Sequence, residues 1–240
     1  MSASGSDVWV STGNECDPTV NTCPPGDKIG HSLSIAHLSG SLKLLQAWRA
    51  PGTAGHGHDW DFGSSPTLFG SGTGTPPRIG ACDKDGRYYA LAANPLGGAP
   101  IWTDRVGAPS ANISIRIDSA VWDGPAGHMF IGGNTTTIRG ASHGGSVREV
   151  DPATGGYLWQ AGLPCAVLGT PTLDSSGVLA AGTYTCPTGA TPGAYLINAA
   201  TGAILHPLPV SASPVFAQPV FAQDSLFVAT TTSGLYDFAP

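Results

Sequence analysis

Charged residues are scarce in this sequence, because Asp, Glu, Lys and Arg make up only 11% of its 240 residues, against roughly 25% in an average soluble domain. Ten Lys and Arg stand against sixteen Asp and Glu, so the formal net charge is −6. No basic run is present that could pair with the phosphates of a nucleic acid or an anionic membrane. The composition therefore predicts that nucleic acid is not a partner.

Long apolar segments are missing as well. No run approaches the roughly 18–20 apolar residues that span a bilayer, so we expect no membrane span. Residues 1–6 have neither the basic start nor the apolar core of a signal peptide. A strand is expected to begin at Asp7, only a few residues after Met1, and we therefore expect the chain to be a segment of a longer protein.

The five cysteines form neither a Cys-x-x-Cys nor a Cys-x-x-Cys-His motif, which argues against a zinc ribbon and a c-type haem. Cys16 and Cys23 bracket a short loop, and Cys165 and Cys186 flank two expected strands. Both spacings suit disulfides, which would indicate a periplasmic or secreted protein. Cys82 is then left over and is expected to be buried. Five buried thiols without a disulfide are the alternative.

Glycine and proline are abundant, with 34 and 21 residues, and this favours many short strands joined by tight turns. Three segments share one plan, a strand, a turn with Gly and a second strand that ends in Trp or Leu; they are 88–102, 147–159 and 194–205. Residues 33–48 fit as a fourth copy, and 234–238 begin a fifth. A small residue, Pro and an apolar strand start precede three of the copies, at 65–68, 170–173 and 218–221.

The period of roughly 45–57 residues is typical of four-stranded propeller blades. We therefore predict an all-β fold, a β-propeller of four-stranded antiparallel blades with about four blades and part of a fifth. Residues 1–240 would form a single domain that is a segment of a larger propeller. The recurring Trp residues are expected to pack between adjacent blades. A β-sandwich is the alternative, but it would not require a repeated Gly and Trp signature.

A polar stretch lies between an expected strand at 7–12 and a second one at 32–38. Asn14 follows the first strand in a Thr-Gly-Asn turn, and Asp27 lies in a Pro-Gly-Asp-Lys loop before the second. An amide and a carboxylate are thus expected at the ends of neighbouring strands, where β scaffolds commonly build a site.

Four motifs in this order resemble the quinoprotein alcohol dehydrogenases, which are propellers that use pyrroloquinoline quinone (PQQ). They are Val-Trp-Val-Ser-Thr-Gly-Asn at 8–14, Pro-Pro-Gly-Asp-Lys at 24–28, His-Asp-Trp-Asp-Phe-Gly at 58–63 and Asp-Lys-Asp-Gly-Arg-Tyr-Tyr-Ala-Leu at 83–91. The short Asp-Trp-Asp-Phe-Gly-Ser-Ser-Pro form is most similar to the polyvinyl-alcohol-dehydrogenase-like branch. The resemblance is sharpest over 8–102, and it implies that the chain is the C-terminal portion of such an enzyme.

The resemblance implies roles for individual residues. Asn14 would ligate Ca²⁺ beside PQQ, Asp27 would take the alcohol proton, and Lys84 would hydrogen-bond the carbonyl edge of the quinone. The cofactor side of the ring would be shaped by Asp59, Trp60 and Asp61. A hard cation prefers oxygen ligands and polarises a carbonyl, while a carboxylate in reach removes the hydroxyl proton as hydride is transferred.

The expected function is therefore PQQ- and Ca²⁺-dependent oxidation of a small-molecule or polymeric alcohol, with an electron acceptor as a further partner. In the family, a carboxylate calcium ligand, a tryptophan floor and a disulfide between adjacent cysteines come from earlier blades, which would precede Asp7. The alternative function is a non-catalytic propeller of the same repeat family that binds or scaffolds other molecules.

Simpler interpretations exist for the candidate residues. Asn14 after Gly13 is a good turn residue, Asp27 could cap its loop or pair with Lys28, and Lys84 between two acids could lie in a solvated turn. A transition-metal cluster is a further alternative, although no fixed ligand spacing supports it; it would consist of His56, His58, Asp59 and Asp61.

Overall fold

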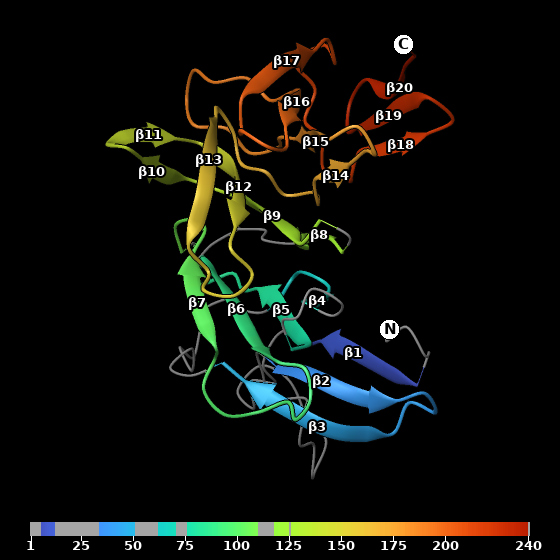
Figure 1. The fold of residues 1–240 in the computed structure, drawn as a ribbon. Coiled ribbons are helices and arrows are strands. Elements are labelled where there is room, and N and C mark those ends of the chain that lie inside the picture. The colour runs from blue at the N-terminus through green and yellow to red at the C-terminus, as the bar shows by residue number, and fades with distance from the viewer. Residues whose placement is uncertain are drawn as a thin grey trace, which may run out of the picture.

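The computed structural model describes residues 6–12, 34–50, 62–70, 76–109, 118–124 and 126–239, and all regular structure within them is β (Figure 1). The first sheet contains β1 (Asp7–Ser11), β2 (Ser34–Ser39) and β3 (Leu44–Arg49). The second contains β4 (Thr67–Phe69), β5 (Arg78–Cys82), β6 (Arg87–Ala92) and β7 (Trp102–Arg105).

The third sheet contains β8 (Val121–Asp123), β9 (His128–Gly133), β12 (Gly145–Val150) and β13 (Tyr157–Leu163). A hairpin of β10 (Thr136–Ile138) and β11 (Ala141–His143) is inserted between β9 and β12. The fourth sheet contains β14 (Thr172–Leu173), β15 (Val178–Gly182), β16 (Ala194–Asn198) and β17 (Ile204–Leu208), and the last contains β18 (Val220–Ala222), β19 (Ser225–Thr230) and β20 (Gly234–Phe238).

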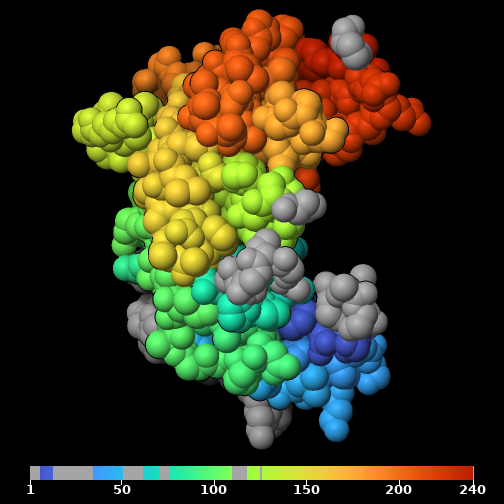
Figure 2. All heavy atoms as spheres, in the orientation of Figure 1, coloured from blue at the N-terminus to red at the C-terminus, as the bar shows by residue number. Residues whose placement is uncertain are grey.

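Within each of these five sheets the strands pair antiparallel in chain order, apart from the β10–β11 insertion. The sheets follow one another along an arc, with the first and last sheets at its two ends (Figures 1 and 2). The prediction of a partial β-propeller with four-stranded antiparallel blades is therefore confirmed. Among the described residues the first and last sheets have three strands each.

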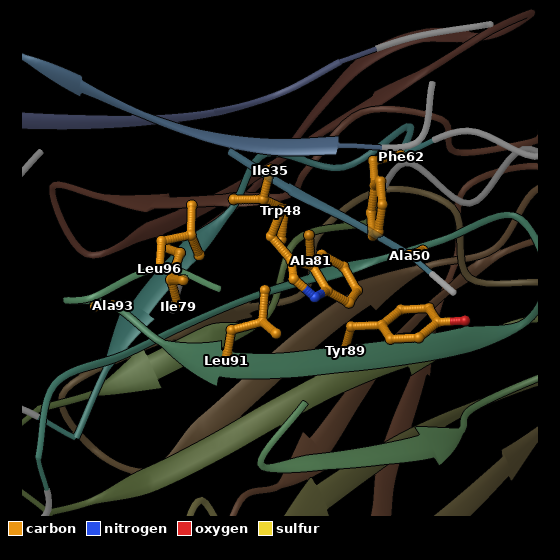
Figure 3. Close-up of a cluster of buried hydrophobic side chains, with 10 residues drawn as sticks. All are labelled: Ile35, Trp48, Ala50, Phe62, Ile79, Ala81, Tyr89, Leu91, Ala93 and Leu96. Atoms are coloured by element: carbon orange, nitrogen blue, oxygen red, sulfur yellow. The ribbon is translucent and has the colours of Figure 1, made fainter. Parts of the chain in front are cut away.

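The hydrophobic core is divided among the junctions between sheets. Figure 3 shows the cluster between the first two sheets, in which Trp48 and Ile35 of the first sheet meet Tyr89 and Leu91 of the second. These side chains are buried because each strand places alternate residues on the face that turns toward the neighbouring sheet.

Tryptophans connect consecutive sheets, as predicted. The indole Nε1 of Trp48 donates to Gly98 O at 2.9 Å, that of Trp102 donates to Pro152 O at 3.0 Å, and that of Trp159 donates to Ala199 O at 2.9 Å. In each case the acceptor lies in the hairpin between the third and fourth strands of the next sheet. The ring fills the wedge between the sheets while its polar edge remains hydrogen-bonded.

Antiparallel pairing also decides which loops share an end of the sheets. The turn between a sheet's second and third strands lies at the same end as the connection to the next sheet. We call this the connection end, and it contains residues 83–86 and 106–109. Most of the candidate residues are in two stretches, 13–33 and 51–61. The residues that flank these stretches lie at strand termini on the connection end.

Candidate functional site

Hydrogen bonds at the connection end join three distant parts of the sequence. The Ser11 hydroxyl donates to Ser64 O at 2.6 Å. The Ser64 hydroxyl in turn accepts from Cys82 N at 2.9 Å and donates to Cys82 O at 3.2 Å. Ser64 and Cys82 are both buried. The end of β1, the segment before β4 and the end of β5 therefore meet at one place.

The turn that carries Lys84 is held by its acidic neighbours. Asp83 Oδ1 accepts from Asp85 N at 2.7 Å, and Asp85 Oδ1 accepts from Arg87 N at 2.8 Å. Asp85 Oδ2 also accepts from the Arg87 guanidinium and from the Tyr89 hydroxyl, both at 2.8 Å. Lys84 is half-buried in this turn. The turn is thus a fixed platform for Lys84 rather than a solvated loop.

Ionisable groups near this turn have displaced pKa values. The hydrogen bond to Asp85 raises the pKa of Arg87 above its ordinary value. Burial raises the pKa of Tyr89, and the charge of Asp85 raises it further. Burial also raises the pKa of Tyr88, with additional contributions from Cys82 and Asp118. Both shifts favour the neutral form of the phenol.

Asp118 is a buried acidic residue near this turn that the sequence did not indicate. It precedes the first strand of the third sheet and is fully buried. Its Oδ2 lies 3.9 Å from the Cys82 Sγ. Asp83, two residues before Asp85, is fully buried as well. With Asp85, which is also buried, the connection end thus holds three buried carboxylates and one half-buried ammonium, which is a strongly polar interior for a protein with so few charges.

Most of the candidate residues lie outside the described part of the chain. They are Asn14, Asp27, Asp59, Trp60 and Asp61, together with Cys16 and Cys23. Lys84 is the one candidate from the resemblance that is described. Within the described ranges, no three His, Cys, Asp or Glu side chains converge closely enough to hold a metal ion.

The predicted disulfide between Cys165 and Cys186 is confirmed. It joins the connection that follows the third sheet to the loop between β15 and β16. Cys82 is buried, as predicted. Among the residues that the structure describes, there is no helix with the length and apolar character that crossing a membrane requires.

Residues 140–144 read Gly-Ala-Ser-His-Gly, which matches the Gly-x-Ser-x-Gly pattern of hydrolase nucleophiles. That pattern requires the serine on a sharp turn from a strand into a helix. Ser142 lies instead in the middle of β11, paired with Thr137 of β10. The match is therefore not a nucleophile elbow.

No family model and no curated protein matches this sequence. Solved structures with a similar fold include BamB from Moraxella catarrhalis, a europium-containing methanol dehydrogenase and the quinohemoprotein alcohol dehydrogenase from Comamonas testosteroni. Their TM-scores are 0.65, 0.67 and 0.62, their identities are 16%, 15% and 16%, and each comparison covers 98% of this chain. The chain spans 58%, 50% and 44% of those chains, about half of their length. The similarities show that this chain has the fold of a β-propeller.

Proposed function

We propose that the connection end of the first two sheets is part of a site that oxidises alcohols with PQQ and Ca²⁺. The observation that carries this proposal is the hydrogen-bonded link from Ser11 through Ser64 to Cys82. Ser11 lies three residues before Asn14, Ser64 lies three residues after Asp61, and Cys82 lies two residues before Lys84. The link therefore supports a common location for the stretches that carry the candidate residues.

The side chains proposed for this site are chemically suited to PQQ and Ca²⁺. The Lys84 ammonium is a donor for an electron-rich carbonyl, and an Asn amide oxygen suits a hard cation. When bound, the cofactor and cation would supply a two-electron acceptor and a Lewis acid. Asp59, Trp60 and Asp61 would line the cofactor side of the site.

The chain's own groups would then manage the proton and the developing charge. Asp27 would accept the hydroxyl proton of the alcohol, which requires it to be ionised and within hydrogen-bond reach. Lys84 would stabilise negative charge on the carbonyl edge from its fixed turn. Asn14 would hold the cation in place. The substrate would be a small-molecule or polymeric alcohol, and a separate acceptor would remove the electrons.

The Cys165–Cys186 disulfide supports an oxidising compartment. Such bonds persist in oxidising surroundings, so we infer a periplasmic or secreted protein. PQQ would have to be loaded in the same compartment.

Reduction of an artificial electron acceptor by alcohol, with PQQ and Ca²⁺ added together and singly, tests the proposal. Asp27→Asn should lower kcat at least 100-fold, in the range of lost general-base catalysis. Lys84→Gln should lower it as well, because it removes an electrostatic donor. The matched controls are Asp224→Asn and Lys43→Gln, two exposed turn residues in other hairpins, which should leave activity unchanged. Equal activity in Asp27→Asn and Asp224→Asn would refute the site.

A non-catalytic binding or scaffolding propeller is the second candidate. The similarity to BamB favours it, because the comparisons with BamB and with the methanol dehydrogenase each cover 98% of this chain. The fold by itself does not decide between the two, since one fold hosts many functions. Failure of PQQ and Ca²⁺ to bind at all, measured by calorimetry, would favour this candidate.

A further inference from the structure

A pocket with a volume of about 510 Å³ lies between the second and third sheets. One wall is the connection between these sheets, and the other is the β10–β11 hairpin with parts of β12 and β13. Two hydrogen bonds tie the walls together, from Ala108 N to Thr135 O at 2.8 Å and from the Asn134 side-chain amide to Ala108 O at 3.1 Å. The pocket is therefore a formed feature of the junction.

The lining of this pocket is cationic, although the protein as a whole is acidic. Two of its ten Lys and Arg are here, and the lining includes no carboxylate. The polar lining residues are Arg105, Arg148, Thr135, Thr136, Thr137, Ser142, Tyr157 and Gln160. A positive pocket rich in hydroxyls and free of acids is complementary to an anion.

Arg148 supplies a buried positive charge in the wall. Its side chain is among the largest fully buried ones, with a residue exposure of 1%. One terminal nitrogen donates to Arg105 O and to the Tyr157 hydroxyl, both at 3.3 Å, and the other donates to Thr136 Oγ1 at 2.6 Å. The guanidinium carbon also lies 4.7 Å from the centre of the Tyr157 ring. These contacts hold the guanidinium in a fixed position at the wall of the pocket.

The hydrogen bonds also decide which groups can donate to a ligand. The Thr136 oxygen accepts from Arg148, so its own hydrogen must point toward a different acceptor. The Tyr157 hydroxyl, by contrast, donates to Arg105 O at 2.7 Å. The Arg105 side chain is exposed and lines the pocket. Arg105 and Thr136 are therefore the donors best placed to reach an anion.

We propose that this pocket binds an oxyanion group, a carboxylate or a phosphate carried by a small ligand. Arg105 and Thr136 donate hydrogen bonds to the oxyanion, and Arg148 provides the buried charge behind them. Charge-assisted hydrogen bonds of this kind are roughly twice as strong as neutral ones. The proposal concerns the binding of an anion and is independent of the alcohol-oxidising site.

Isothermal titration calorimetry of the purified chain with inorganic phosphate and with malonate, at low ionic strength, tests the pocket. We expect saturable binding at one site, and the tighter of the two anions identifies the oxyanion class. Arg105→Gln should weaken that binding about tenfold, the equivalent of one charge-assisted hydrogen bond. Thr136→Val, which keeps the shape of the side chain and removes its hydroxyl, should weaken it several-fold.

Arg139→Gln is the matched control, because Arg139 is an exposed arginine of the same hairpin that does not line the pocket. It should leave the affinity unchanged. The chosen variants avoid Arg148, whose removal from the buried junction could unfold the protein. Absence of saturable binding for both anions would overturn the proposal, and so would equal losses in Arg105→Gln and Arg139→Gln.

Discussion

One backbone conformation recurs at a single position in the hairpins between third and fourth strands. Gly98, Gly155 and Gly202 have positive φ values of 73°, 80° and 71° there, and Leu42 occupies the corresponding place in the first sheet with φ 61°. Glycine adopts this region without a Cβ penalty, whereas other L-residues pay roughly 1–2 kcal/mol. Leu42 is therefore the one residue of this set whose side chain disfavours the conformation.

Space explains why two of the other hairpins require glycine, whereas a Cβ at Gly98 would meet no atom within 4 Å. A Cβ at Gly155 would lie 2.7 Å from the Trp102 ring, and one at Gly202 would lie 2.4 Å from the Trp159 ring. Gly155 and Gly202 thus serve both the turn and the packing of an indole from the preceding sheet. The Leu42 side chain is 69% exposed, so no such ring restricts this position.

Gly202→Ala and Gly234→Ala separate the two effects. Gly234 also has a positive φ, 88°, but a Cβ there meets no atom within 4 Å. We expect Gly234→Ala to cost about 1 kcal/mol of unfolding free energy from backbone strain alone. Gly202→Ala should cost at least about 2 kcal/mol more, because Trp159 must also move. Urea unfolding measures both, and equal losses would show that the indole yields without cost.

The outer strands of successive sheets do not place their tryptophans identically. In the third sheet a bulge precedes Trp159, which pairs with Glu149. In the first sheet the corresponding bulge precedes Gln46, which pairs with His37. Trp48 lies two residues later. Since residues two apart in a strand share a face, Trp48 reaches the same junction, and the Gln46 side chain accepts from Leu96 N at 2.8 Å. The sequence repeat alone could not reveal this offset.

Local motifs explain what could be predicted from the sequence. The repeated turns, the interblade tryptophans and the Cys165–Cys186 spacing each have a short-range signal, and the propeller and the disulfide followed from them. The link from Ser11 to Ser64, the burial of Asp118 and the pocket around Arg148 have no such signal. They depend on how strands of different sheets meet. The roles of Asn14, Asp27 and Lys84 were inferred from resemblance and stay predictions.

Trp102→Phe tests how much one junction between sheets contributes to the free energy of unfolding. Trp102 is 7% exposed, its ring lies 5.4 Å from that of Tyr88, and its Nε1 bond to Pro152 O crosses between sheets. Loss of this bond and of part of the ring should lower the unfolding free energy by about 2 kcal/mol. Trp122→Phe is the control, because Trp122 is half-buried and should cost less than about 1 kcal/mol. Similar losses in both variants, measured by circular dichroism during urea unfolding, would contradict a special role for the docked indole.

At the scale of the whole molecule, the core formed by the described residues is a chain of four clusters, each between two consecutive sheets. Trp48 and Leu91 belong to the first cluster, Phe69 and Met129 to the second, Phe130 and Leu179 to the third, and Leu226 and Ala194 to the fourth. Each interior sheet therefore packs against two clusters, and each terminal sheet packs against one. Stability in such an arrangement is close to a sum of nearest-neighbour terms, as in repeat proteins.

Amide hydrogen exchange should follow this arrangement. Leu226 is 4% exposed in the cluster between the last two sheets, so Leu226→Ala should remove about 2–5 kcal/mol there. Because the last sheet packs against this one cluster among the described residues, we expect faster exchange over β18–β20 with little change over β5 and β6. Leu91→Ala, in the cluster between the first two sheets, is the reciprocal variant and should accelerate exchange in β1–β3 while sparing β18–β20. A uniform increase across all five sheets in either variant would mean that the arc unfolds as one cooperative unit. The nearest-neighbour description would then be wrong.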